Sequence, residues 1–362
     1  MNTKIVYVVV SSPSDIYLEQ AWASVWSLKH YNPDARVTFV MDDETFDGLR
    51  ENTNRKGVLD YVDEPISIHF SEDISGKERS RILKTTLREI VKGDFLFIDS
   101  DTIIAASLSE IDTWHCHIGM VYDLHCRLSE YPFAELIRRE SRYLYGDKLG
   151  DDTDQFNSGV IFAKDDQIAH EFYLKWHGNW EVSKKLTDFR DQPALIKTCD
   201  ELPQVIEPIN GIYNCQIVVS IAYLCNAKII HFFNNPWKKS SISPFLDKKF
   251  YIGIKEKGGI STEVESIILN CKAEFYTPTM PITMDEVQIG RSDLYMMILK
   301  LYKSHKLLFR LLDWLCGFWR RVKKVPSLLG HICRTYLNNK NRHVKERRTK
   351  ETNTRFDTRV LS

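Results

Sequence analysis

The stretch FLFIDSDTII, residues 95–104, decides the fold. Four apolar residues of strand character run directly into Asp99 and Asp101, which places both carboxylates at the carboxyl end of a buried strand. Side chains two positions apart on an extended chain point to the same side. Two carboxylates that converge repel each other unless a cation lies between them, and oxygen ligands suit Mn²⁺ or Mg²⁺. The residues alone also allow both side chains to cap a turn or the next helix.

Apolar runs of strand length flank this stretch and alternate with helical patterns. The runs are residues 5–10, 37–41, 118–122, 159–163 and 228–233. Residues 17–30 and 80–91 carry apolar side chains at spacings of three and four, which is typical of crossover helices. Strands this apolar are covered on both faces, so we predict an α/β fold with a mostly parallel central sheet flanked by helices. Helical patterns dominate from residue 165 to about 226.

Charge divides the chain into two parts, although the formal net charge is zero. Residues 291–362 contain 18 Lys and Arg against 5 Asp and Glu, so this segment is basic and the body is acidic. The eight cysteines show no CxxC spacing, which favours reduced thiols over a metal or disulfide framework. The first residues show no leader pattern and run into a strand-like segment, and we therefore expect a cytoplasmic protein.

Six motifs follow one another along the chain: IVYVVV (5–10), FLFIDSD (95–101), VYDL (121–124), FNSGVIFA (156–163), DQPAL (191–195) and IIHFFNNPW (229–237). In this order they resemble glycosyltransferase family 8, which includes glycogenin and bacterial lipopolysaccharide galactosyl- and glucosyltransferases. The resemblance implies a GT-A fold and retaining transfer of a hexose, glucose or galactose, from a UDP-sugar to a saccharide or lipid-linked saccharide. It further implies a Mn²⁺ or Mg²⁺ cofactor and a role in cell-envelope polysaccharide or lipopolysaccharide synthesis.

The resemblance implies a metal site formed by Asp99, Asp101 and His231. An imidazole is a reasonable third ligand for Mn²⁺, although a lone histidine after an apolar strand also fits a structural role. The family's segment after this histidine contains a glycine and a lysine that the present chain lacks. Lys238 or Lys239 is therefore the candidate for the remaining phosphate contact.

The resemblance also implies a set of donor-binding residues. Tyr17 stands where an aromatic ring would stack on uracil, although a tyrosine that opens a helix can equally be a packing residue. Arg81 and Lys84 lie one helical turn apart and would face the donor phosphates, with solvated surface charge as the alternative. Ser100, between the two aspartates, belongs to the same donor site.

Four polar residues resemble the family's sugar-binding and catalytic set: Asp123, Asn157, Asp191 and Gln192. A pyranose ring taken out of water needs hydrogen bonds to its hydroxyls, which short polar side chains provide, although each residue could instead be a cap. The attacking group is open: Asp191 or Gln192 acts as a nucleophile, or the acceptor enters on the leaving-group face. Because a neutral amide is a poor nucleophile, front-face attack with Gln192 stabilising the oxocarbenium-like state is favoured.

Four segments are predicted: a catalytic domain at 1–279, a connection at 280–293, a basic amphipathic helical segment at 294–340 and a basic, disordered tail at 341–362. Lys and Arg interrupt the apolar stripe between Leu294 and Val322, which argues against a membrane span. A basic helix rich in Leu, Phe and Trp fits the surface of an anionic membrane, here the inner face of the cell membrane, and packing on the catalytic domain is the alternative. No nucleic-acid partner is expected, because the cations are not joined to a binding module.

A sugar nucleotidyltransferase is the main competing function. Such enzymes need a Gly-rich, basic loop after the first strand to hold a triphosphate, and VVVSSPSDIYLEQ (8–20) contains no glycine. A non-catalytic carbohydrate- or membrane-binding relative of the fold is a further alternative. The altered segment after His231 is the hint for it.

Overall fold

The computed structural model describes residues 1–51, 54–131, 134–146, 148–232, 243–273, 288–290 and 292–321. The chain divides into two compact units, Met1–Thr277 and Pro278–Ser362. The first unit contains both β-sheets and every described residue of the predicted site.

The first unit is built on a seven-stranded sheet with the order β3-β2-β1-β4-β7-β6-β8. The strands are β1 (Lys4–Val9), β2 (Val37–Asp42), β3 (Glu64–Ile68), β4 (Phe95–Ile98), β6 (Ile118–Tyr122), β7 (Phe156–Ala163) and β8 (Ile206–Pro208). β7 runs antiparallel to both of its neighbours, and the remaining pairs are parallel. The predicted α/β fold with a mostly parallel sheet is therefore confirmed. The strand β8 lies inside the segment that the sequence pattern described as predominantly helical.

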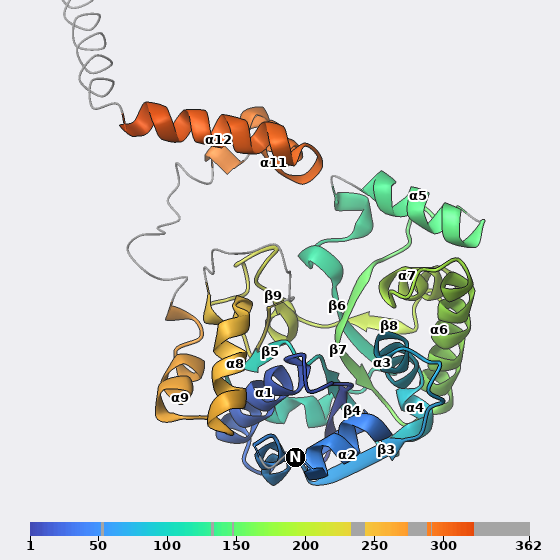
Figure 1. Ribbon diagram of the computed structural model, residues 1–362. Helices are drawn as coiled ribbons and strands as arrows, with labels where there is room; N and C mark the ends of the chain where they lie inside the picture. The colour runs from blue at the N-terminus through green and yellow to red at the C-terminus, as the bar shows by residue number, and fades with distance from the viewer. Residues whose placement is uncertain are drawn as a thin grey trace, which may run out of the picture. The chain divides into compact units, whose positions relative to one another are not determined.

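Helices cover both faces of this sheet, as Figure 1 shows. They are α1 (Tyr17–Tyr31), α2 (Asp43–Glu51), α3 (Gly76–Thr85), α4 (Leu87–Ile90), α5 (Ala134–Tyr145), α6 (Gln167–Lys185), α7 (Gln192–Glu201), α8 (Lys248–Lys257) and α9 (Thr262–Leu269). One core cluster joins the sheet to α1, α8 and α9, and the other joins it to α3, α6 and α7. Phe172 and Trp176 of α6 are fully buried, and each such apolar side chain stabilises the fold by roughly 1.5–3 kcal/mol.

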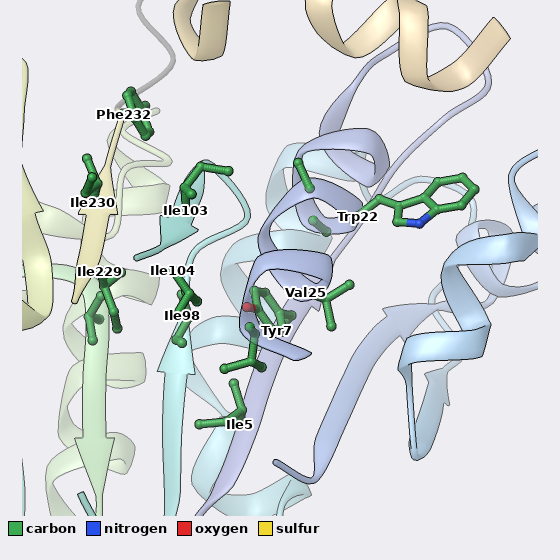
Figure 2. Packing of buried hydrophobic residues seen from close by; sticks show 14 of the residues in the cluster. Ile5, Tyr7, Trp22, Val25, Ile98, Ile103, Ile104, Ile229, Ile230 and Phe232 are labelled. Carbon is green, nitrogen blue, oxygen red and sulfur yellow. The ribbon is translucent and has the colours of Figure 1, made fainter. Parts of the chain in front are cut away.

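A small second sheet determines where the predicted histidine lies. It consists of β5 (Thr102–Ile104), β10 (Ile229–His231) and β9 (Cys215–Gln216), in the order β5-β10-β9. β10 pairs antiparallel with β5, so that His231 lies opposite Thr102, and the next amide, of Phe232, donates to the carbonyl of Asp101. Figure 2 shows the isoleucines of β5 and β10 packed beside β1 and α1. The hydrophobic pairing of two short strands therefore brings the end of β10 to the carboxylate pair.

The described part of the second unit is helical. α11 (Asp293–Ser304) begins at Ser292, whose hydroxyl accepts from the amide of Tyr295, and α12 (Lys306–Arg321) follows after His305. The apolar stripe of the sequence is therefore divided between two helices. Among the described helices, none is long and apolar enough to cross a membrane. Val322, the rest of the predicted segment to 340 and the tail at 341–362 lie outside the described residues.

Candidate functional site

The two aspartates and the histidine meet at the carboxyl end of β4. Asp99 and Asp101 follow this strand directly, and His231 reaches them from the end of β10. One potential ligand atom of each residue lies within 4.8 Å of the others. The imidazole Nε2 of His231 lies 3.1 Å from a carboxylate oxygen of Asp101. The amide of Asp99 donates to the carbonyl of Gly159 on β7, which fixes the turn between the two aspartates to the sheet.

The chemistry of this cluster fits a divalent cation. Burial raises the pKa of Asp99, and the neighbouring charge of Asp101 raises it further, against the opposing effect of Lys84. Burial thus makes a negative charge at Asp99 costly, and a bound cation would offset that cost. Two carboxylates and one imidazole form an oxygen and nitrogen ligand set that suits Mn²⁺, and the carboxylates alone suit Mg²⁺.

A cavity of about 570 Å³ opens beside this cluster. Its walls come from the ends of β1 and β2, the start of α1, the first turns of α3 and the two aspartates. Tyr17, Arg81 and Ser100, all predicted as donor-binding residues, line the cavity together with Asp99 and Asp101. Tyr17 is 49 % exposed, so part of its side chain is accessible from the solvent. The volume is in the range of sites for nucleotide-sized ligands.

The first turns of α3 supply positive charge to the cavity wall. Lys77, Arg79 and Arg81 all line the cavity. Arg79 forms ion pairs with Asp42 at 2.9 Å and Glu44 at 2.8 Å. Arg81 lies 3.1 Å from Asp191, whose charge raises the pKa of the guanidinium. Lys77 and Arg79 were missed in the sequence, although the run GKERSRILK carries four cations within one helix and was the available signal.

Lys84 occupies a different position from Arg81. It is 3 % exposed, and its ammonium lies 3.1 Å from both oxygens of Asp99 and 3.1 Å from Asp191. It also donates to the hydroxyl of Ser158. Burial alone would raise the pKa of Asp191, but Lys84 and Arg81 together hold that pKa far below its usual range. Lys84 is thus a buried counter-charge that joins the carboxylate of Asp99 to the start of α7.

The predicted sugar-binding residues divide into two groups. Asp191 and Gln192 stand at the start of α7, where the side-chain amide of Gln192 donates to the carbonyl of Phe156. Asp123 follows β6 and accepts from the side chains of Asn157 and Gln155. The first group is connected to Asp99 through Lys84. The second lies on the β7 side of the same sheet end, so the structure brings both groups to the edge where the cluster lies.

The turn after Asp123 is strained. Leu124 and His125 both adopt left-handed backbone conformations, with φ of 59° and 57°. The side chain of Gln216 accepts from the amide of Leu124, and the amide of Gln216 donates to Nε2 of His125. Burial lowers the pKa of His125 to about 4, which keeps this acceptor neutral. The strand β9, which the sequence did not reveal, therefore holds the turn that positions Asp123.

The loop between β1 and α1 is fixed by a buried ion pair. Arg55 and Glu19 form a two-point contact at 2.7 and 3.0 Å, and both side chains are nearly fully buried. Nη1 of Arg55 donates to the carbonyl of Ser12, and Nη2, which also contacts Glu19, donates to the hydroxyl of Ser11. Both serines line the cavity. The predicted Lys238 and its alternative Lys239 lie outside the described residues.

Comparisons with known proteins give only distant similarities. No protein-family model and no curated protein matches the chain. Mouse xyloside xylosyltransferase 1, in its apo form, is 13 % identical over 64 % of this chain and 98 % of its own, with a TM-score of 0.45. The galactosyltransferase LgtC, solved with donor and acceptor sugar analogues, is 16 % identical over 73 % and 100 %, with a TM-score of 0.47. The glycosyltransferase GlyE of Streptococcus pneumoniae, also in its apo form, is 15 % identical over 77 % and 64 %, with a TM-score of 0.41. At scores below 0.5, the function has to be inferred from the chain's own residues.

We predict that Asp101→Asn lowers Mn²⁺ affinity, because it removes one charge from the ligand set while preserving side-chain shape. His231→Ala is expected to lower it by about 10- to 100-fold, the range typical of disturbing a metal's surroundings. The measurement is a calorimetric Mn²⁺ titration of wild type and variants. Asp166→Asn, at the amino-terminal cap of α6, is the matched control and should leave the titration unchanged. Equal affinities of wild type and both site variants would contradict the metal assignment.

Proposed function

We propose that the protein is a metal-dependent glycosyltransferase that transfers a hexose from a UDP-sugar to a saccharide or lipid-linked saccharide with retention of configuration. One observation carries the proposal: the cluster of Asp99, Asp101 and His231 borders a nucleotide-sized cavity whose α3 wall is cationic. A nucleotide diphosphate needs both features, a divalent cation for its oxygens and fixed positive charge around them. GT-A architecture and a likeness to family 8 are part of the same proposal.

The diphosphate is the group that the site is suited to stabilise. When the donor glycosidic bond breaks, negative charge grows on the departing diphosphate. Bound Mn²⁺ or Mg²⁺ would supply Lewis-acid stabilisation of that charge from Asp99, Asp101 and His231. Arg81 would add a guanidinium from the cavity wall, and Tyr17 would hold the uracil ring by stacking, with Ser100 in the donor site between the aspartates. Lys238 is proposed for a further phosphate contact.

The contacts of Asp191 favour front-face attack over a covalent intermediate. One of its carboxylate oxygens faces Arg81, and the other receives both Lys84 and the hydroxyl of Ser158. A carboxylate whose two oxygens are engaged by cations is a weak nucleophile. Gln192 uses its NH₂ group on the carbonyl of Phe156, so its carbonyl oxygen is the end available to stabilise an oxocarbenium-like centre. Asp123 and Asn157 are proposed to bind sugar hydroxyls.

The second unit is proposed to attach the enzyme to the inner face of a cell membrane, where cell-envelope saccharides are assembled on lipid carriers. Leu307, Leu311, Trp314 and Phe318 of α12 recur at spacings of three and four and are 54–82 % exposed. Lys306 and Arg310 lie on the same helix. An apolar stripe beside basic residues is suited to the surface of an anionic membrane.

The proposed activity predicts metal-dependent cleavage of a nucleotide sugar. Purified protein is incubated with a panel of UDP-, GDP- and ADP-sugars, with Mn²⁺ or with chelator, and the released nucleoside diphosphate is measured. We expect slow hydrolysis of a UDP-hexose with Mn²⁺, and its loss with chelator and in Asp99→Asn. Release of pyrophosphate from UTP and a sugar phosphate would instead indicate a nucleotidyltransferase. No turnover of any donor, with intact Mn²⁺ binding, would indicate a non-catalytic relative.

Membrane attachment is predicted to be separable from activity. A chain that ends at residue 277 keeps Asp99, Asp101 and His231, so it should hydrolyse the donor as the full chain does. It should lose binding to vesicles of anionic lipid in a sedimentation assay, and salt should weaken binding of the full chain by screening its cations. If the full-length protein does not bind anionic vesicles at low salt, the membrane proposal is wrong and the catalytic proposal is unaffected.

A further inference from the structure

A chain of hydrogen bonds runs from the proposed metal ligand His231 to the proposed sugar ligand Asp123. Nδ1 of His231 lies 3.0 Å from Oδ1 of Asn214. The NH₂ group of Asn214 donates to Oδ1 of Asn157 at 2.8 Å, and the NH₂ group of Asn157 donates to Asp123 at 2.9 Å. Asn214, His231 and Asn157 are 0 %, 2 % and 7 % exposed, so water does not compete freely for these groups.

One backbone amide fixes which group donates and which accepts in every hydrogen bond of this series. The amide of Gly159 donates to the side chain of Asn157 at 3.0 Å. A backbone N–H can only donate, so the atom of Asn157 that faces it is the carbonyl oxygen. The same oxygen faces Asn214, which must therefore present its NH₂ group to Asn157 and its carbonyl oxygen to His231. At the far end, the Asp123 carboxylate needs a donor, which is the NH₂ group that this orientation leaves to Asn157.

The histidine tautomer follows from the same argument. A carbonyl oxygen can only accept, so the imidazole nitrogen that faces Asn214 carries a hydrogen. We infer that Asn214 holds a hydrogen on Nδ1 of His231 and thereby leaves Nε2, beside Asp101, as the ring nitrogen that would bind the proposed cation. In the opposite tautomer, Nε2–H would donate to Asp101 and occupy the ligand atom, while two acceptors would face each other at Asn214. Asn214 is thus a positioning residue for the metal, and this role rests on the proposed function.

The imidazole of His231 lies directly against Gly159, which limits its movement on that side. A Cβ atom on Gly159 would lie 2.0 Å from Cε1 and 2.6 Å from Nδ1 of His231. The ring is therefore packed directly on the backbone of β7, at a position that only glycine permits. The same residue supplies the amide that orients Asn157 and the carbonyl that accepts from Asp99. One glycine thus gives the ring its space and the hydrogen-bond chain its direction.

The tautomer can be measured without any metal. Protein labelled with ¹⁵N-histidine is studied in metal-free buffer by NMR of the ring nitrogens, which shows directly whether Nδ1 carries a hydrogen. His231→Gln assigns the resonance. We expect Nδ1 of wild-type His231 to carry a hydrogen, whether or not Nε2, which faces the Asp101 carboxylate, carries one too. Asn214→Leu should shift the ring towards the Nε2–H tautomer and lower Mn²⁺ affinity by about 10- to 100-fold. Asn214→Asp keeps an acceptor for Nδ1–H, so it should keep the tautomer and most of the affinity.

Two further variants distinguish a positioning role of Asn214 from a general loss of stability. Asn179→Leu removes a buried asparagine of α6 that bonds to Thr198 and Glu201, so it should lower stability without changing the tautomer or Mn²⁺ affinity. Asn157→Leu breaks the chain one link further from His231 and should move both readouts in the direction of Asn214→Leu, which keeps the test valid if that variant does not fold.

The outcomes distinguish this inference from the proposed function. A wild-type His231 with a hydrogen on Nε2 alone, or an Asn214→Leu protein with unchanged tautomer and Mn²⁺ affinity, would overturn the role of Asn214. A wild-type protein that shows the Nδ1–H tautomer but binds no Mn²⁺ would refute the metal-dependent function while leaving the tautomer assignment in place.

Discussion

The concentration of negative charge at the end of β4 is the constraint on which the surrounding structure depends. Asp99 and Asp101 lie together where a buried strand ends, and burial makes their charges costly. Two cations offset this charge. Lys84 is buried between Asp99 and Asp191, and Arg81 lies on the other side of Asp191. His231 completes the cluster from a separate sheet. The positive charge that faces these carboxylates thus comes from one helix, α3.

The buried polar groups between His231 and Asp123 are joined by hydrogen bonds. A buried amide or imidazole without a partner would cost roughly 1–3 kcal/mol. The bonds from His231 through Asn214 and Asn157 to Asp123 satisfy these groups and also fix their orientation. One network of buried hydrogen bonds therefore connects the proposed metal ligand His231 to the proposed sugar ligand Asp123.

The sequence predicts those strands and site residues that carry a local pattern. Long apolar runs predicted β1, β2, β4, β6 and β7, and the alternation of Asp99 with Asp101 predicted that both carboxylates face one point. β8 and β9 were missed because strands of three and two residues are too short to show a periodicity. Asn214 and Gln216 carry no local signal, since their role depends on pairing with β10 and on a turn about ninety residues earlier. Their importance arises only from tertiary structure.

The sequence also did not predict which cations of α3 face the cavity and which are buried. Arg81 and Lys84 were both expected at the donor, yet Arg81 lines the cavity whereas Lys84 lies behind the carboxylates. A spacing of three residues places two side chains near each other but does not tell which of them reaches solvent. We propose that a cation held by Asp99, Asp101 and His231 would stabilise the diphosphate of the donor. Calorimetric binding of UDP and UMP, each with and without Mn²⁺, is the measurement that tests this proposal. We predict that Mn²⁺ strengthens binding of UDP far more than that of UMP, and equal UDP affinity with and without the metal would contradict the proposal.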